Sequence, residues 1–94
     1  MIFISAEDIK RNFTVTSLMD AIESIYIKDF KVPIRHIHNI DYLKHSNDPS
    51  QLMLMPAFLN KEDYGIKLLN VFPSNPINNL SRVNALYILF DSKN

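Results

Sequence analysis

The sequence predicts an α+β fold in which two N-terminal helices pack on a mixed, mostly antiparallel sheet. Its first third has helix-start signals followed by apolar residues at helical spacing. The remainder consists of short apolar and β-branched runs separated by turn residues. Its 94 residues allow one domain with a modest core, because a chain of this size buries only about 60–65% of the surface that its unfolded form exposes.

A short strand and a short helix are predicted at the N-terminus. Residues 2–5 are mostly apolar and β-branched, which favours a strand. Ser5 and Asp8 have the spacing of a capping box, in which each side chain bonds the backbone amide of the other residue. A helix is therefore predicted to begin just after Ser5.

A longer helix is predicted over residues 17–30. Thr14 or Thr16 can cap its N-terminus, and Pro33 follows at a distance where helices have usually ended. Apolar residues at helical spacing give this segment a stripe for one side of a sheet. The residues of the stripe are Leu18, Ile22 and Ile25.

Four strands are predicted after the helices, each an apolar or β-branched run bounded by turn residues. Their ranges are 32–41, 51–59, 66–72 and 82–91. Pro56 is expected to stop or bulge the second run, because proline cannot donate to a strand ladder. The last run leads into Asp-Ser-Lys-Asn, a pattern typical of a hairpin turn. This ending indicates a fragment or a sheet completed by another copy, and the alternative is a frayed tail after a finished strand.

The composition excludes several classes of function. Ten basic and ten acidic residues cancel, so no basic face for nucleic acid or an anionic membrane is expected. The chain has no cysteine, which excludes disulfides and thiolate chemistry. Its apolar runs are far shorter than the ~20 residues of a membrane span. Acidic residues follow after a few apolar ones at the N-terminus, unlike a signal peptide, so a cytoplasmic location is the default.

Gly65 is the only glycine, and Lys67 follows it inside an otherwise apolar run. The glycine either occupies a turn that needs positive φ or permits the close approach of a ligand or another backbone. The lysine either extends to solvent along its stem or holds a cation in a half-buried pocket for an anion or a carbonyl oxygen.

Arg35 and two histidines lie in the first predicted strand run. Arg35 is either a surface charge or a bidentate clamp for a carboxylate, for which a planar guanidinium is suited. His36 and His38 point to the same face of a strand, a geometry that metal sites use. A third ligand, His45 or Asp41, would lack a signature spacing. No metal site is therefore expected.

A dinucleotide is not expected to bind these residues by a glycine-rich loop, since one glycine cannot form such a loop. A catalytic triad cannot be argued from spacing either, because triads are defined by geometry and not by order.

Several motifs in sequence order resemble the N-terminal domain of the ornithine cyclodeaminase/mu-crystallin family. They are "LMLMPAFL", "GIKLLNVFPSNP" and "RVNALYILFD", preceded by "FISAEDIKRNFTVTSLMDAIESIY" and "VPIRH". The resemblance covers essentially the whole chain. It implies that residues 1–94 are a partial N-terminal substrate-binding and dimerisation domain. The NAD(P)-binding Rossmann domain of the family is absent from these residues.

The resemblance also implies roles for three cationic residues. Arg35 would pair with the carboxylate of an amino or imino acid. Lys67 would bind the same carboxylate or the nearby carbonyl or imine. Arg82 stands where family members often have a threonine on the cofactor side of the cleft, so a cofactor contact is carried over to Arg82. The catalytic aspartate of cyclodeaminating members would lie beyond Asn94, and no catalytic residue is assigned within this chain.

The expected function is therefore the substrate-binding part of an NAD(P)-dependent oxidoreductase or cyclodeaminase. Its substrate would be an amino acid, a keto acid or a cyclic imine, and the protein would form a homodimer. The 94-residue chain alone is expected to be inactive and to bind neither NAD nor NADP. The alternative is a non-catalytic module that binds a small carboxylate or only dimerises.

Overall fold

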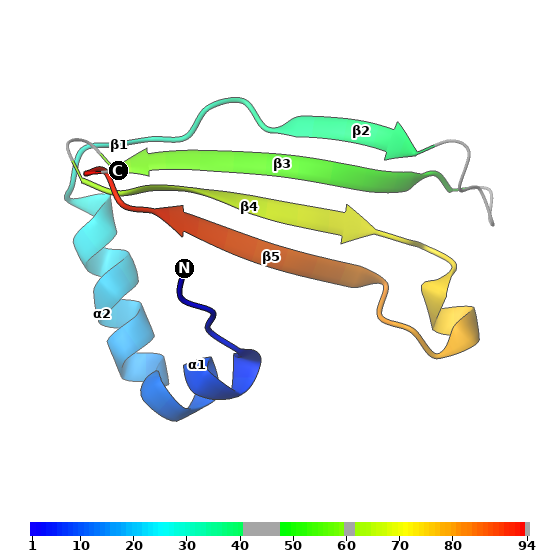
Figure 1. Ribbon diagram of the computed structural model, residues 1–94, viewed down its shortest axis with the longest axis horizontal. Helices are drawn as coiled ribbons and strands as arrows, with labels where there is room; N and C mark the ends of the chain where they lie inside the picture. Colours follow the sequence, from blue (N-terminus) through cyan, green and yellow to red (C-terminus); the bar gives the residue numbers. More distant parts are fainter. Residues whose placement is uncertain (41–47, 60–61, 94) are drawn as a thin grey trace.

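The computed structural model describes residues 1–40, 48–59 and 62–93 and contains two α-helices followed by one five-stranded sheet (Figure 1). Every strand pairing in these ranges is antiparallel. The predicted α+β class and the mostly antiparallel sheet are confirmed.

The expected strand over residues 2–5 is wrong, since residues 1–5 form no regular element. An apolar run becomes a strand only where a neighbouring strand pairs with its backbone. None of the described strands pairs with residues 2–5.

Two reciprocal capping boxes begin the helices. Helix α1 spans Ala6–Asn12, and helix α2 spans Val15–Tyr26. Before α1, the Asp8 amide donates to the Ser5 hydroxyl at 3.2 Å, and the Ser5 amide donates to the Asp8 carboxylate at 2.9 Å. Before α2, Thr14 and Ser17 exchange the equivalent bonds at 3.0 and 3.1 Å. Thr14 is therefore the N-cap of α2, and the helix ends four residues earlier than predicted because Phe30 joins the sheet.

The sheet is built around strand β3, Ser50–Leu59. Its neighbours on one side are β1, Phe30–Lys31, and β2, His36–Ile40, and on the other side it pairs with β4, Tyr64–Val71. Strand β5, Val83–Phe90, pairs with β4 and forms the far edge. Between β4 and β5 the chain makes the short 3-10 helix η2, Asn75–Asn78. These bounds agree with the predicted runs, except that the first run divides into unpaired backbone and β2.

The segment between β1 and β2 contains one residue more than the strand it faces. Lys31 pairs with Phe58 and His36 pairs with Leu54, so residues 32–35 stand against residues 55–57. An extra residue of this kind is a bulge, which removes the bulged segment from the ladder. Proline lies in both segments, at Pro33 and Pro56, and neither can donate a hydrogen bond. The expectation that Pro56 stops or bulges the second run is wrong, because β3 continues through Pro56 in unbroken register with β4. The extra residue lies in the facing segment, 32–35, which ends with Arg35.

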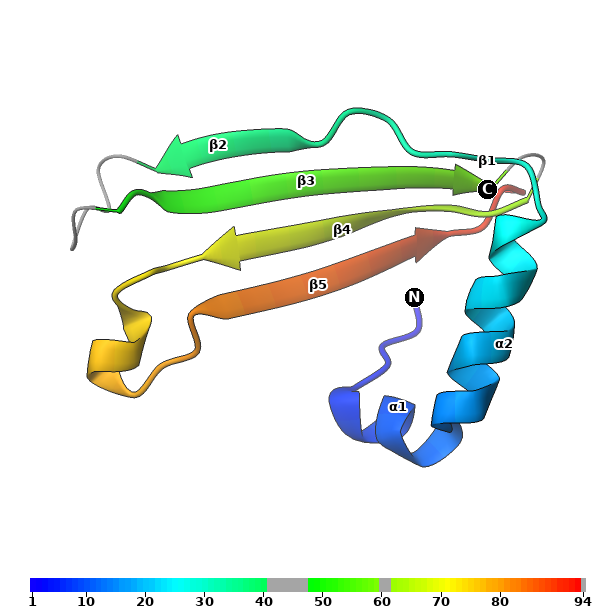
Figure 2. The ribbon, with the colours of Figure 1, turned by 180° about the vertical axis from the view of Figure 1, so that it is seen from behind.

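The helices meet the sheet at one corner and leave most of the apolar surface uncovered. Figures 1 and 2 show α2 running away from the end of the sheet at which β1 lies. Tyr26 packs edge-on against Phe30 there, with ring centroids 6.2 Å apart. Lys28 and Glu62 form an ion pair of 3.1 Å that joins this corner to the segment after β3. No apolar side chain of the described residues is fully buried.

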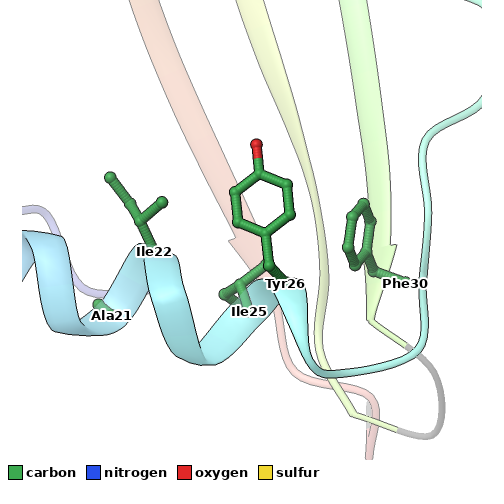
Figure 3. Close-up of a pocket in the computed structure, with 5 residues that line it drawn as sticks. All are labelled: Ala21, Ile22, Ile25, Tyr26 and Phe30. Atoms are coloured by element: carbon green, nitrogen blue, oxygen red, sulfur yellow. The ribbon is translucent and has the colours of Figure 1, made fainter.

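An apolar hollow of about 350 Å³ lies at this corner (Figure 3). It is lined by residues of α2 and by Phe30 of β1. The residues are Ala21, Ile22, Ile25, Tyr26 and Phe30. Ile22 belongs to the predicted stripe and remains 50% exposed. The stripe is thus present on the helix, and the Tyr26 hydroxyl is the one polar side-chain group among the residues that line the hollow.

Candidate functional site

Lys67 lies in the middle of β4, between Met55 of β3 and Tyr87 of β5. Residues paired directly across antiparallel strands share a face of the sheet, so these three side chains are neighbours. The Lys67 side chain is exposed. Within residues 1–40, 48–59 and 62–93 it makes no hydrogen bond or ion pair. Lys67 is therefore a cation available to an anionic ligand on an otherwise apolar part of this face.

Gly65 is buried beside Lys67, and its backbone has an ordinary extended conformation without positive φ. A Cβ atom built at Gly65 would meet the Tyr87 hydroxyl, the Tyr87 Cζ atom at 2.8 Å and the Ile88 carbonyl oxygen at 2.9 Å. Of the two interpretations of this glycine, the turn is wrong and the close approach of another backbone is confirmed. The single glycine of the chain allows a tyrosine ring and the β5 backbone to approach β4.

Arg35 lies at the end of the bulge, immediately before β2. Arg35 itself has no strand partner, and the next residue, His36, is the first of β2 to pair, with Leu54. Lys67 pairs with Met55 from the other side. Arg35 therefore lies in the unpaired segment that faces residues 55–57 of β3, and Lys67 lies on the other side of β3. Arg35 is exposed and, like Lys67, has no ion pair in the described part of the chain.

Arg82 does not join this pair. It precedes β5, where its carbonyl accepts a hydrogen bond from the Phe72 amide at 2.8 Å. Tyr87, which pairs with Lys67, is five residues further along the chain. Five residues of strand correspond to about 17 Å. The structure therefore brings together Arg35 and Lys67 and leaves Arg82 at the end of the sheet next to η2.

His36 and His38 lie on the opposite face from Lys67, because successive residues of a strand alternate between faces. Their rings are nearly parallel, with centroids 6.4 Å apart and an interplanar angle of 8°. No group of three or more metal-ligating side chains occurs among the residues that the structure describes. Asp41 and His45, the possible third ligands, lie outside the described residues.

Among the described residues, one carboxyl group has a shifted pKa, and it lies in α1. The hydrogen bonds that Asp8 accepts from the Ser5 hydroxyl and the Ser5 amide lower its pKa below the ordinary value of 3.8. The cause is the capping box, since both bonds favour the ionised carboxylate. This shift concerns the stability of a helix end and not the cation pair on the sheet.

Two members of the site, Met55 and Tyr87, were missed by sequence reasoning. In the sequence, Met55 and Tyr87 are only apolar and aromatic members of the predicted strand runs 51–59 and 82–91. Both become neighbours of Lys67 through the register of β3, β4 and β5, which the sequence of a single strand does not contain. The one signal of these contacts in the sequence is Gly65, because a glycine inside a strand often marks a place where another group approaches the backbone closely.

The described residues form a small α+β domain with the exposed cations Arg35 and Lys67 on opposite sides of β3. A model of the ornithine cyclodeaminase/mu-crystallin family matches residues 1–94, and the chain belongs to that family. It is also 28% identical over 91 residues to an uncharacterized protein of Schizosaccharomyces pombe, covering 96% of this chain and 28% of that protein.

Two solved structures have a similar fold. Thermococcus litoralis Δ1-pyrroline-2-carboxylate reductase, in complex with NADH and L-proline, matches with a TM-score of 0.85 and 22% identity. The match covers 99% of this chain and 29% of the reductase. An archaeal alanine dehydrogenase dimer with bound NAD matches with a TM-score of 0.77 and 23% identity, covering 96% of this chain and 27% of the dehydrogenase. The chain thus spans somewhat more than a quarter of the length of each relative.

The helices of the described segments are too short or too polar to cross a membrane.

Proposed function

We propose that this chain is the substrate-binding part of an NAD(P)-dependent oxidoreductase or cyclodeaminase that acts on an amino acid, a keto acid or a cyclic imine. The observation that carries the proposal is the placement of Arg35 in the segment that faces residues 55–57 of β3, with Lys67 paired to Met55 on the other side of β3. Family membership and the names of the two structural neighbours support the reaction class.

The chemistry of the two cations is suited to one end of such a substrate. A guanidinium presents paired donors that match the two oxygens of a carboxylate. An ammonium is a compact charge that can bind the same carboxylate or the adjacent carbonyl or imine. Met55, between them, provides a flexible apolar floor on which the carbon skeleton can lie. Together these groups bind and orient the substrate with its carboxylate fixed and its α-carbon above the sheet.

The described residues do not fit a dinucleotide phosphate site. Gly65 is covered by Tyr87, and the first turn of α2 is closed by the Thr14–Ser17 capping box. NAD(P), when bound to the complete protein, would accept or supply the hydride at the α-carbon. We assign no step of that transfer to the residues of this chain. Arg82 is the residue that we propose for a contact with the cofactor, because it lies apart from the carboxylate site.

An association role is a second proposal, carried by a different observation. Strand β5 is an edge strand, and its Leu86 and Leu89 are 50% and 65% exposed. The unpaired backbone of an apolar edge recruits another chain. We propose that two copies associate as a two-fold homodimer, the commonest closed arrangement. This association is compatible with catalysis and also with the alternative of a non-catalytic carboxylate-binding or dimerisation module.

An activity assay of the complete gene product tests the primary proposal. Oxidation of NADH and NADPH is followed at a fixed wavelength with a panel of keto acids plus ammonia and of cyclic imines, and release of ammonia is followed with L-ornithine. We expect turnover of at least one member, and loss of substrate affinity in Arg35→Ala and Lys67→Ala. Arg11→Ala, an exposed change of the same charge in α1, is the matched control. Kinetics that stay at the wild-type level in both site variants would show that these cations are only surface charges.

A further inference from the structure

Tyr87 has an unusual position relative to the proposed carboxylate site. It pairs with Lys67 across β4 and β5, but the end of its ring lies over Gly65, two residues earlier on β4. The ring can occupy this place because Gly65 has no Cβ atom. Tyr87 nevertheless remains 57% exposed, so its position is not explained by burial in a core.

The ring restricts the space available to the Lys67 side chain. On its own face, Lys67 has Gly65 and Leu69 before and after it along β4, and Met55 and Tyr87 across from it. The space over Gly65 would be open in a sheet with a small residue at position 87, and here the phenol fills it. The opposite side is bounded by Met55, a flexible residue of β3, and the segment that contains Arg35 lies beyond β3.

A lysine stem has several rotatable bonds and keeps its ammonium in one place only when packing limits them. The Tyr87 ring is flat and rigid, lies over Gly65, and comes from β5, which pairs with β4 on the side away from Arg35. We propose that Tyr87, held over Gly65, is a positioning residue that directs the Lys67 ammonium toward the Arg35 side of the face. This inference rests on the proposed function, because it assigns Tyr87 a task at the same carboxylate site.

The proposal assigns the effect to the ring and not to the phenol hydroxyl. No hydrogen bond joins the Tyr87 hydroxyl to Lys67 among the described residues. Tyr87→Phe keeps the ring and is the matched control, whereas Tyr87→Ala opens the space over Gly65. Tyr87→Leu retains apolar packing but loses the far end of the ring, and it provides a second test if the alanine variant does not fold.

A double-mutant cycle with Lys67→Ala in the complete gene product is the decisive experiment. We expect Tyr87→Ala to raise the KM for the amino, keto or imino acid about tenfold, within the range of coupling between contacting residues. The KM for NAD(P)H should stay within twofold, and Tyr87→Phe should match the wild type. In the Lys67→Ala background, Tyr87→Ala should have no further effect on substrate KM. A purely structural tyrosine would lower the melting temperature without this dependence on Lys67.

Failure of this inference and failure of the proposed function give different results. If Lys67→Ala alone leaves substrate KM unchanged, the carboxylate site is wrong and the role of Tyr87 is overturned with it. If Lys67→Ala raises KM but Tyr87→Ala has no effect, or has the same effect in both backgrounds, the site stands and the positioning role is overturned.

Discussion

Replacing Gly65 with alanine should destabilise the protein, although glycine-to-alanine changes in extended backbone usually do the reverse. Where the backbone conformation suits alanine, the change stabilises a protein by about 0.4–1 kcal/mol, because it lowers the conformational entropy of the unfolded chain. At Gly65 the new methyl group would meet the Tyr87 ring and the Ile88 carbonyl oxygen, the latter at 2.9 Å. The tyrosine can rotate away, but the carbonyl belongs to the β4–β5 ladder and cannot move without separating the two strands.

Overpacking of this kind costs about 1–3 kcal/mol. After the gain of about 0.4–1 kcal/mol from the unfolded state, the mid-range values leave a net loss of about 1.3 kcal/mol. Urea unfolding of Gly65→Ala followed by circular dichroism measures this loss as a lower midpoint at an unchanged slope. Gly65→Ala introduced into Tyr87→Ala separates the two contacts, and it should still destabilise because the Ile88 carbonyl is unaffected. A variant as stable as the wild type, or more stable, would show that β5 does not approach β4 as closely as described.

The remaining predictions concern the caps of the two helices, the proposed contact of Arg82 with the cofactor, and the proposed homodimer. Thr14→Ala should lower the free energy of unfolding by about 1 kcal/mol, since it removes the N-cap of α2; equal urea midpoints would contradict this role. The folded-state pKa of Asp8 is lowered, so its contribution to stability is present above its unfolded pKa and is lost as the pH falls through the folded value. The difference in stability between the wild type and Asp8→Asn should therefore shrink on acidification below about pH 4, and a difference independent of pH would refute the capping interaction. Arg82→Ala should raise the KM for NAD(P)H and leave the KM for the carboxylate substrate unchanged, and the opposite pattern would move Arg82 to the substrate site. Light scattering of the 94-residue chain should give about twice 10.9 kDa at micromolar concentration, and a mass of 10.9 kDa unchanged on tenfold concentration would exclude the homodimer.

The parts of the fold that local sequence determines were predicted closely. Both helices begin at capping pairs that are three residues apart, and such pairs are visible in the sequence. The strands β3, β4 and β5 are apolar runs bounded by turn residues, and each was found within about two residues of its ends. These features depend on neighbours along the chain, so one sequence contains the information that specifies them.

The features that depend on pairing between distant residues could not be predicted. Residues 2–5 have the composition of a strand, but composition does not supply a partner. The bulge opposite Pro56 depends on the relative registers of β1 and β2 against β3. Arg35 and Lys67 were selected through a family resemblance, whereas their location on opposite sides of β3 follows from the pairings of β1, β2 and β4 with that strand. The position of Tyr87 over Gly65 could not be predicted for the same reason, because it depends on the register of β5 against β4.

The central claim is that Arg35 and Lys67 bind the carboxylate of the substrate, and the comparison of a carboxylate with its neutral amide tests it most directly. For the substrate that the complete gene product turns over best, kcat/KM is measured for the acid and for its carboxamide, in the wild type and in Arg35→Ala/Lys67→Ala. Each charge-assisted hydrogen bond is worth about 1.5–3 kcal/mol, so the wild type should prefer the acid by about tenfold or more. The double variant should show little preference, because the cations that distinguish the two compounds are gone. A preference for the acid that survives in the double variant would contradict the account and would place the carboxylate elsewhere in the protein.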